Sequence, residues 1–293
     1  MTPPGALVEA AIEQAAGRPA RILRRSRLGG GDICLTERIE TSAGPFVLKS
    51  GGSAAAGLFR AEAEGIRALR RSGTSLRVPE VVACRDEHPS FLLLEDLGQG
   101  DPGPDFDDRV GLGLAELHRA GSDAFGFTHD NFCGATPQPN PRTASWIEFY
   151  GRWRIGHQTE LASNAGLLSS AERGSIERLI ARLDTWLIEP PEGPALIHGD
   201  LWSGNLHVAG GGGPALIDPA AYFAHREAEL GMMTLFGGFP ARVHAAYAEA
   251  FPLDAGWRGR NPLYQLYHLM NHLNLFGGGY HGQVMAIVGR YVG

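Results

Sequence analysis

The sequence predicts an α+β fold of two lobes, a small β-rich N-terminal lobe and a larger, mainly helical C-terminal lobe. Short apolar or alternating runs typical of strands fall before residue 96. Longer segments with helical spacing dominate after residue 109. Between them, residues 98–108 are rich in Gly, Pro and Asp, which is typical of a connector between lobes. We therefore expect one lobe over 1–96 and the other over 97–293.

The composition excludes several classes of protein. The 293 residues, 43% of them apolar, are enough to bury a large core. A net charge of −6 without a long basic run disfavours nucleic acid as a partner, and the absence of a long apolar window disfavours a membrane. Three cysteines without a CxxC pair argue against a disulfide framework or a structural zinc site, so we expect a cytoplasmic protein. A sugar or nucleotide substrate agrees better with this composition.

Residues 28–50 read as a glycine-rich opening followed by a strand, a turn and a second strand. Gly29, Gly30 and Gly31 would let the backbone approach a phosphate closely, although their spacing matches neither the Walker A nor the GxGxxG pattern. The second strand ends in Lys49, the only lysine beside 25 arginines. Where arginine replaces lysine almost everywhere, a retained lysine indicates a position that needs a compact ammonium. The alternative is that Lys49 is an exposed residue retained by chance.

The next segment, residues 58–71, has the spacing of a helix with one apolar stripe. Glu62 falls on that stripe, whereas Glu64 falls on the opposite, solvated face. A carboxylate on the buried side needs a partner. Lys49 is the natural candidate, and a partly exposed Glu62 at the edge of the stripe is the alternative.

Two further strands, over 78–84 and 91–94, lead into a polar connector that resembles a hinge between the lobes. Glu95 and Leu97 belong to this hinge. The helical segments that follow are predicted over residues 109–120, 144–165 and 170–187, and from residue 227 to the end.

The strongest chemical pattern lies between residues 195 and 219, which read ALIHGDLWSGNLHVAGGGGPALIDP. An apolar strand leads to a loop with Asp200 and Asn205, and a hairpin that turns at four glycines ends at Asp218. Phosphoryl transfer from a nucleotide needs such a set: one carboxylate that orients and deprotonates a hydroxyl, and oxygen ligands that hold Mg²⁺. A transition metal agrees less well with these oxygen-rich ligands.

At these residues the sequence resembles the protein-kinase-like fold of small-molecule kinases, which include aminoglycoside phosphotransferases and choline kinases. The resemblance implies that nucleotide lies between the lobes, with Glu95 and Leu97 at its binding site. It also implies that Lys49, paired with Glu62, holds the ATP phosphates. Asp200 is then the catalytic base, and Asn205 and Asp218 bind Mg²⁺. The Phe-Gly that follows the metal aspartate in protein kinases is replaced by Pro-Ala at 219–220, as in small-molecule kinases.

Further segments are similar to fructosamine kinases, also called ketosamine 3-kinases. These segments are HGDLWSGN, IDPAAYFAHREAEL, LFGGFP, DNFCGATPQPN and YQLYHLMNHLNLFGGGY. Membership implies ATP-dependent phosphorylation of the 3-hydroxyl of a sugar–amine adduct, free or protein-bound, as a deglycation step. The sequence departs from the family at Cys133, where an aliphatic residue is common.

A ketosamine carries hydroxyls and a secondary ammonium, so its pocket is expected to offer an aromatic wall and carboxylates. Trp202 and Glu227 are candidates for these, and His225 and Arg226 for binding hydroxyls. Arg226 has an equally supported alternative role, in which it bridges loop carboxylates and holds the Asp218 region in place.

Two other functions stay open from the sequence. One is an aminoglycoside or choline-type kinase, against which the DNF and PQPN segments argue. The other is a non-catalytic pseudokinase, which is expected to have lost one of the four key residues, Lys49, Asp200, Asn205 or Asp218. The preferred ketosamine and the oligomeric state are not determined by the sequence.

Overall fold

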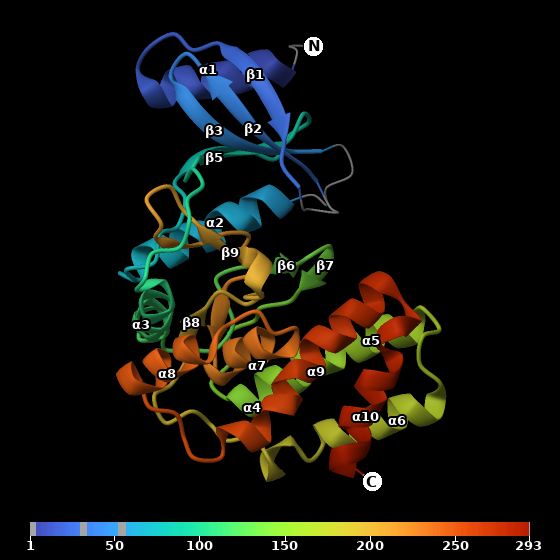
Figure 1. Ribbon diagram of the computed structural model, residues 1–293. Helices are drawn as coiled ribbons and strands as arrows, with labels where there is room; N and C mark the ends of the chain where they lie inside the picture. Colours follow the sequence, from blue (N-terminus) through green and yellow to red (C-terminus); the bar gives the residue numbers. More distant parts are fainter. Residues whose placement is uncertain (1–3, 30–33, 52–56, 293) are drawn as a thin grey trace.

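The computed structural model describes residues 4–29, 34–51 and 57–292, and it confirms the predicted α+β class (Figure 1). The N-terminal lobe, at the top of Figure 1, is built on a five-stranded antiparallel sheet in the order β1-β2-β3-β5-β4. The strands are β1 (Ile22–Arg27), β2 (Leu35–Thr41), β3 (Gly44–Ser50), β4 (Val81–Arg85) and β5 (Phe91–Glu95). The remaining part, below it, is mainly helical.

The two faces of the sheet are covered by different helices because side chains alternate along a strand. Leu93 of β5 packs with the helix α1 (Pro4–Ala16), which the sequence reading did not assign. Leu92 and Leu94 point the other way and join the main core with α2 (Leu58–Arg71). That core continues into the helical lobe, because α2 packs both against the sheet and against β6 of the C-terminal part.

The C-terminal part places two short hairpins and a strand pair among its helices. The hairpins are β6 (Asn131–Cys133) with β7 (Thr136–Gln138) and β9 (Leu206–Val208) with β10 (Pro214–Leu216), and β8 (Ala195–Ile197) pairs with β11 (Tyr222–Ala224). The helices are α3 (Phe106–His118), α4 (Trp146–Phe149), α5 (His157–Asn164), α6 (Ser170–Ile180), α7 (Glu227–Leu235), α8 (Ala241–Ala250), α9 (Trp257–Phe276) and α10 (His281–Val292). No helix in the described ranges has the length and apolar character to cross a membrane.

The predicted helix over 144–165 is observed as an unbroken helical run over 146–164, but it is not α-helical throughout. A π-helical segment, Tyr150–Gly156, separates α4 from α5. Within it, the Arg154 side chain is fully buried, with its guanidinium 3.9 Å from the ring centre of Tyr222 and a hydrogen bond to the Pro139 carbonyl. A buried guanidinium needs such a cage of rings and carbonyls. Helical periodicity in the sequence does not reveal this tertiary environment.

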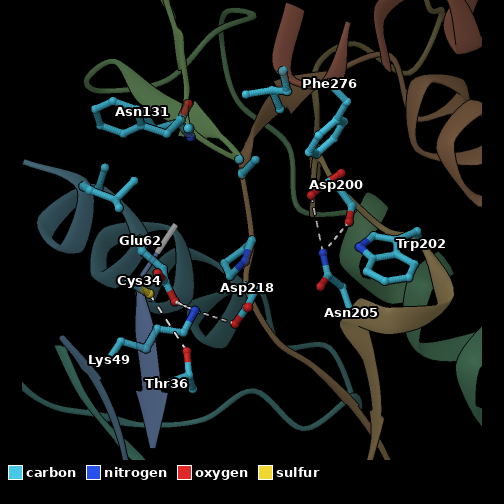
Figure 2. A pocket seen from close by; sticks show the side chains of 18 residues that line it. Cys34, Thr36, Lys49, Glu62, Asn131, Asp200, Trp202, Asn205, Asp218 and Phe276 are labelled. Carbon is cyan, nitrogen blue, oxygen red and sulfur yellow. Dashed lines mark hydrogen bonds and ion pairs between the residues drawn. The ribbon is translucent and has the colours of Figure 1, made fainter. Parts of the chain in front are cut away.

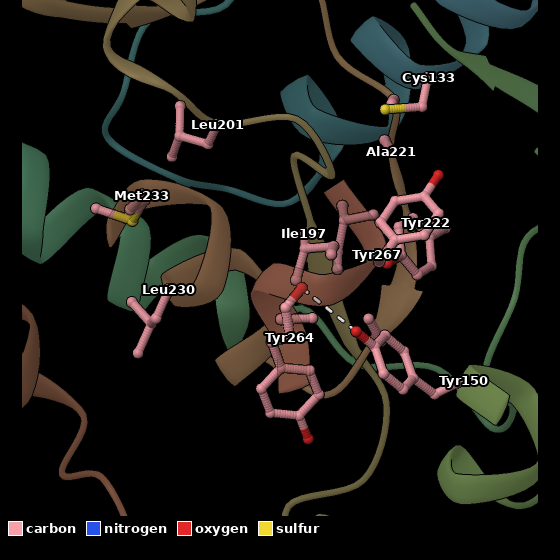
Figure 3. Close-up of a cluster of buried hydrophobic side chains, with 14 of the residues drawn as sticks. Cys133, Tyr150, Ile197, Leu201, Ala221, Tyr222, Leu230, Met233, Tyr264 and Tyr267 are labelled. Atoms are coloured by element: carbon pink, nitrogen blue, oxygen red, sulfur yellow. Dashed lines mark hydrogen bonds between the residues drawn. The ribbon is translucent and has the colours of Figure 1, made fainter. Parts of the chain in front are cut away.

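Tyrosine side chains pack among aliphatic residues in the main buried cluster (Figure 3). Tyr150 donates a hydrogen bond to the Leu263 carbonyl at 2.6 Å, and Tyr264 accepts one from the Trp146 indole at 3.1 Å. Buried Tyr hydroxyls and Trp N–H groups usually find a hydrogen-bond partner, and both of these do. The strand pair β8–β11, which leads into and out of the polar loops of the cleft, rests on this cluster.

Candidate active site

Two adjoining cavities lie in the cleft and share Lys49, Asp218, Asn205 and Trp202 in their walls. The first, of about 650 Å³, extends from these residues to the connector between the lobes. The second, of about 550 Å³, extends toward β6 and the end of α9. The shared residues therefore stand where a molecule in one cavity meets a molecule in the other.

Lys49 forms a clamp with two carboxylates at the shared wall (Figure 2). Its Nζ donates to Glu62 Oε1 and to Asp218 Oδ1, both at 2.7 Å. Strand alternation places Lys49 on the α2 side of β3, opposite Leu92 in the register, while Leu48 faces α1. Burial lowers the pKa of Lys49, but the charges of Glu62 and Asp218 more than offset this effect and raise it.

Asp200 follows β8 and faces the second cavity, with 22% of its side chain exposed. Burial, reinforced by the charges of Glu229 and Asp218, raises its pKa to about 8. Asn205 Nδ2 donates to the Asp200 carbonyl at 2.8 Å and lies 3.5 Å from Asp200 Oδ2 (Figure 2). Since the amide nitrogen of Asn205 is used in this way, its amide oxygen is the atom available to a cation.

The loop that carries Asp200 is anchored by His198 and by a residue that the sequence reading missed. His198 Nε2 donates to the Ile217 carbonyl at 2.8 Å, and its Nδ1 accepts from the Asp200 N–H at 3.3 Å. Burial lowers the pKa of His198, which agrees with this neutral tautomer. The buried Glu229 of α7 accepts the backbone N–H groups of His198 and Gly199. Glu229 lies in the quoted segment IDPAAYFAHREAEL, but nothing in the spacing indicates its partner.

Asp218 has an unusual backbone conformation, with φ at 56°. Among the described residues other than glycine, it is the only one with a positive φ. Aspartate tolerates the left-handed region better than most residues, at a cost of about 1 kcal/mol. The backbone strain aims a half-exposed carboxylate into the cleft.

The first cavity is lined by residues of the hinge and of the glycine-rich segment that the sequence indicates. Glu95, Leu97 and Gly29 line it, and the Glu95 carboxylate is turned toward Arg77, 2.8 Å from its Nη2. Glu95 therefore offers mainly backbone to the cavity. Gly30 and Gly31 lie outside the described residues.

The second cavity has aromatic walls. Trp202 and Phe276 are 43% and 58% exposed, and both lie beside Asp200 (Figure 2). Phe276, at the end of α9, belongs to a segment that resembles the family, but no spacing in the sequence predicts its place in this cavity. The same is true of Asn131 and Phe132 of β6, which line the same cavity.

A buried amide network holds β6 in place. Asn131 Oδ1 accepts from Gln138 and Asn140 at 2.7 Å each, and Asn131 Nδ2 donates to the Ala221 carbonyl at 2.9 Å. The network thus connects the cavity wall to the segment that follows Asp218. It gives the DNF and PQPN segments a positioning role.

The structure does not bring His225, Arg226 and Glu227 to either cavity, which corrects their expected place in the substrate pocket. All three are buried. Glu227 forms a two-bond ion pair with Arg260, and His225 is hydrogen-bonded to the Tyr264 hydroxyl. A buried ion pair of this kind satisfies its own charges and leaves none for a ligand.

Arg226 connects loops of the helical lobe. It donates to Glu192 and to the carbonyls of Phe251 and Pro252, and it lies 3.8 Å from the ring centre of Phe251. As in the alternative role predicted from the sequence, Arg226 binds a loop carboxylate, that of Glu192. The bridge ties α7 to the end of α8, however, and not to Asp218.

Glu229 gives a testable expectation for loop anchoring. In Glu229→Gln, an amide NH₂ replaces one of two acceptors, so one buried backbone N–H loses its bond, at about 1–3 kcal/mol. We expect a lower melting temperature and a lower kcat with a nearly unchanged KM for ATP. Removing the negative charge also lowers the pKa of Asp200, so the acid limb of the rate profile should move to lower pH. Glu177→Gln, at an exposed ion pair, is the control, and an unshifted profile for Glu229→Gln would contradict the assignment.

Comparisons with known proteins agree with this geometry. A sequence profile described as fructosamine kinase matches residues 5–293. A protein described as a probable ketoamine kinase, from Synechocystis sp., is 39% identical over 285 residues, or 94% of this chain and 93% of the relative. The chloroplastic protein-ribulosamine 3-kinase of Arabidopsis thaliana is 38% identical over 286 residues, or 94% of this chain and 85% of the relative.

Solved structures show the same architecture. A candidate fructosamine-3-kinase from Thermobifida fusca has a TM-score of 0.85 and 36% identity, with 96% of each chain covered. An aminoglycoside phosphotransferase in complex with AMP-PNP and hygromycin B has a TM-score of 0.64 and 16% identity, over 96% of this chain and 97% of the other. The second comparison establishes the kinase-like fold alone.

Proposed function

Because this chain belongs to the fructosamine kinase family, we propose that it is an ATP-dependent ketosamine kinase, which transfers the γ-phosphoryl group of ATP to the 3-hydroxyl of a sugar–amine adduct. The observation that carries the proposal is the meeting of the two cavities, where Lys49, Asn205 and Asp218 form a shared wall and Asp200 lines the second cavity beside them. Relatives named ketoamine kinase and protein-ribulosamine 3-kinase support the substrate class.

In this proposal ATP occupies the cavity that reaches the connector. Val47 and Ile217 line that cavity from the two lobes and offer apolar walls to a purine ring. The backbone around Leu97 offers hydrogen-bonding groups at its end. Lys49, held by Glu62, extends toward the shared wall, where its ammonium can neutralise phosphate oxygens.

Asp218 and Asn205 are the residues that would hold Mg²⁺. Their donors are oxygens, as this cation requires, and both face the wall that the two cavities share. A bound Mg²⁺ would neutralise charge on the phosphate groups during transfer. Lys49 Nζ donates to Asp218 Oδ1 at 2.7 Å and so holds the carboxylate in place.

The acceptor hydroxyl would lie in the second cavity, within reach of Asp200. A carboxylate there can accept the hydroxyl proton and orient the oxygen toward the phosphate. Trp202 and Phe276 supply aromatic faces against which a sugar ring and a secondary ammonium can pack. The cavity opens to solvent past these exposed rings, so both free and protein-bound ketosamines are proposed substrates.

Two alternatives make different predictions. An aminoglycoside or choline-type kinase shares the fold, and the 16% identity of the solved aminoglycoside phosphotransferase supports the fold only. A pseudokinase would lack part of the phosphate machinery, whereas here all four key residues are present and arranged around one wall.

A direct assay distinguishes these functions. Purified protein is incubated with MgATP and, separately, with a fructosamine, a ribulosamine, choline and an aminoglycoside, and the phosphorylated product is identified by phosphorus NMR. We expect phosphorylation of ketosamines at the 3-hydroxyl. Product only with choline or the aminoglycoside, or no product with any acceptor, would contradict the proposal.

The Lys49 clamp gives a second expectation. Lys49→Arg preserves the charge, but the longer planar group cannot sit between Glu62 and Asp218 in the same geometry. A displacement of about 1 Å can cost on the order of a hundredfold in rate, so we expect a large loss of kcat/KM for ATP. Glu62→Gln should give a smaller loss in the same direction.

A neutral control is Glu87→Gln, because the Glu87 side chain is 76% exposed. Glu64 lies on the opposite face of α2 from Glu62, but it is a less suitable control because its carboxylate lies 2.7 Å from His129 Nδ1. Wild-type kinetics for Lys49→Arg, measured with the melting temperature, would remove Lys49 from the nucleotide site.

A further inference from the structure

Three potential metal ligands from distant parts of the chain meet below the second cavity. Cys133 ends β6, Asp200 is in the loop after β8, and His268 lies in α9. Their ligand atoms all lie within 4.8 Å of one another. Cys133 and His268 are 1% and 4% exposed, whereas Asp200 lines the cavity. An ion would therefore reach the group from the substrate side.

His268 is aimed into this group without a partner. Its Nδ1 is buried, lies 3.9 Å from Asp200 Oδ1, and makes no hydrogen bond within the described ranges. An unsatisfied buried polar atom is unfavourable, so such an atom in a native protein calls for an explanation. Burial, reinforced by His272 and Arg154, lowers the pKa of His268 to about 3. The imidazole is therefore neutral, which is the form that binds metals.

Cys133 is the second unusual member of the group. Its Sγ accepts a hydrogen bond from Asn271 Nδ2 at 3.4 Å, and it belongs to the buried cluster drawn in Figure 3. Burial raises the pKa of this thiol well above its ordinary value, so it stays protonated until a cation displaces the proton.

We propose that Cys133, Asp200 and His268 form a Zn²⁺ site, and that zinc inhibits the kinase by occupying its catalytic base. Thiolate, imidazole and carboxylate are the ligands that zinc prefers, and three protein ligands leave the fourth position for water. On binding, the protons of the Cys133 thiol and of the Asp200 carboxyl pass to solvent, the zinc ion loses bound water, and it forms bonds to the sulfur, the carboxylate oxygen and His268 Nδ1. Mg²⁺ prefers oxygen ligands, so it is directed instead to Asn205 and Asp218.

The geometry is close to that of a bound ion. Bonds of about 2.0–2.3 Å in a tetrahedron place ligand atoms roughly 3.3–3.6 Å apart. The distance between His268 Nδ1 and Asp200 Oδ1 is 3.9 Å, and every pair of ligand atoms lies within 4.8 Å. The site must therefore contract by at most roughly 1.5 Å on binding, which rotations of the three side chains can supply. Binding of zinc does not depend on the proposed function, whereas inhibition by zinc rests on it.

Binding is tested on the purified full-length protein without substrate. Zn²⁺ affinity is measured by calorimetry, and Co²⁺ is used as a spectroscopic probe for thiolate-to-metal charge transfer. We expect one ion per chain with a thiolate band. Cys133→Ala should abolish the band and weaken zinc binding by more than about tenfold. Loss of a residue that only hydrogen-bonds to a metal ligand already lowers metal affinity by about that factor. His268→Asn should weaken binding similarly.

Cys84→Ala is the matched control, because Cys84 is on β4, away from both cavities. Cys34→Ala tests the other thiol in the cleft. Zinc binding of unchanged affinity in Cys133→Ala, or a loss of affinity only in Cys34→Ala, would overturn the proposal.

Inhibition is then measured with saturating MgATP and a ketosamine. We expect added zinc to inhibit the wild type and excess Mg²⁺ not to relieve the inhibition. Cys133→Ala should keep its basal rate and resist zinc. If zinc binds as described but no ketosamine is phosphorylated, the proposed function fails and the site stands. If the wild type and Cys133→Ala are both active and zinc affects their rates equally, the proposed inhibition through this site is wrong.

Discussion

Asp200→Asn is expected to lower kcat by at least about a hundredfold while leaving ATP affinity nearly unchanged. Asparagine preserves the size of the side chain but cannot accept the proton of a hydroxyl, and loss of a positioned base costs about 10²–10⁴ in rate. Asp200 lines the second cavity and not the one that reaches the connector, so nucleotide binding should persist. Calorimetric titration with MgATP beside steady-state rates measures both. Normal turnover would show that Asp200 is not the base.

The same variant should be more stable than the wild type at alkaline pH. The pKa of Asp200 is about 8 in the folded protein and about 3.9 in an unfolded chain. The folded state therefore binds the proton more tightly, and the wild type loses stability as pH rises from about 4 to about 8. Asparagine carries no titrating proton, so the gain in melting temperature for Asp200→Asn should be small at pH 5 and larger at pH 8.

The pH dependence of the rate follows from the same group. A base must be deprotonated to act, so kcat/KM of the wild type should fall as pH drops below about 8. A rate profile that is flat between pH 6 and pH 9, or a melting-temperature gain for Asp200→Asn that shrinks with rising pH, would contradict the raised pKa.

Asp218→Asn is expected to abolish turnover, with only a small change in melting temperature. The substitution removes the negative charge that would hold Mg²⁺ and one of the two ion pairs of Lys49. Asparagine tolerates the positive φ of 56° at this position about as well as aspartate. Alanine is a poorer choice here, because it adds backbone strain to the loss of charge.

The measurement combines rates at several Mg²⁺ concentrations with thermal melting. We expect excess Mg²⁺ not to rescue Asp218→Asn. A matched control is Asp254→Asn, whose carboxylate is 54% exposed and pairs with Arg260 away from the cleft. Full Mg²⁺-dependent activity in Asp218→Asn would remove Asp218 from the metal site.

Much of the site is determined by local sequence. Helical spacing places Glu62 on the buried side of α2, and strand alternation places Lys49 on the facing side of β3. These two periodicities are enough to predict the ion pair that the structure shows at 2.7 Å. Asp200 and Asn205 are five residues apart in one loop, so their contact is also local. The two-lobed α+β fold follows from the order of strand-like and helix-like segments, and the structure confirms it.

Other features were decided by tertiary structure, because they depend on contacts between residues far apart in the chain. His225, Arg226 and Glu227 sit in a segment typical of the family, yet their partners Tyr264, Phe251 and Arg260 bury them. No spacing of residues in the sequence indicates these long-range contacts.

The same reason explains what the sequence could not indicate. Glu229 anchors the Asp200 loop from 30 residues away, and Cys133 meets Asp200 and His268 only where β6, the loop and α9 come together. Cysteine spacing disfavours a structural zinc site, and that prediction concerns local motifs alone. A ligand group assembled from three separate elements has no spacing to recognise, since periodicity records only which residues share a face of one element. The sequence determined the chemistry present in the chain, and the packing of the lobes decided which groups meet.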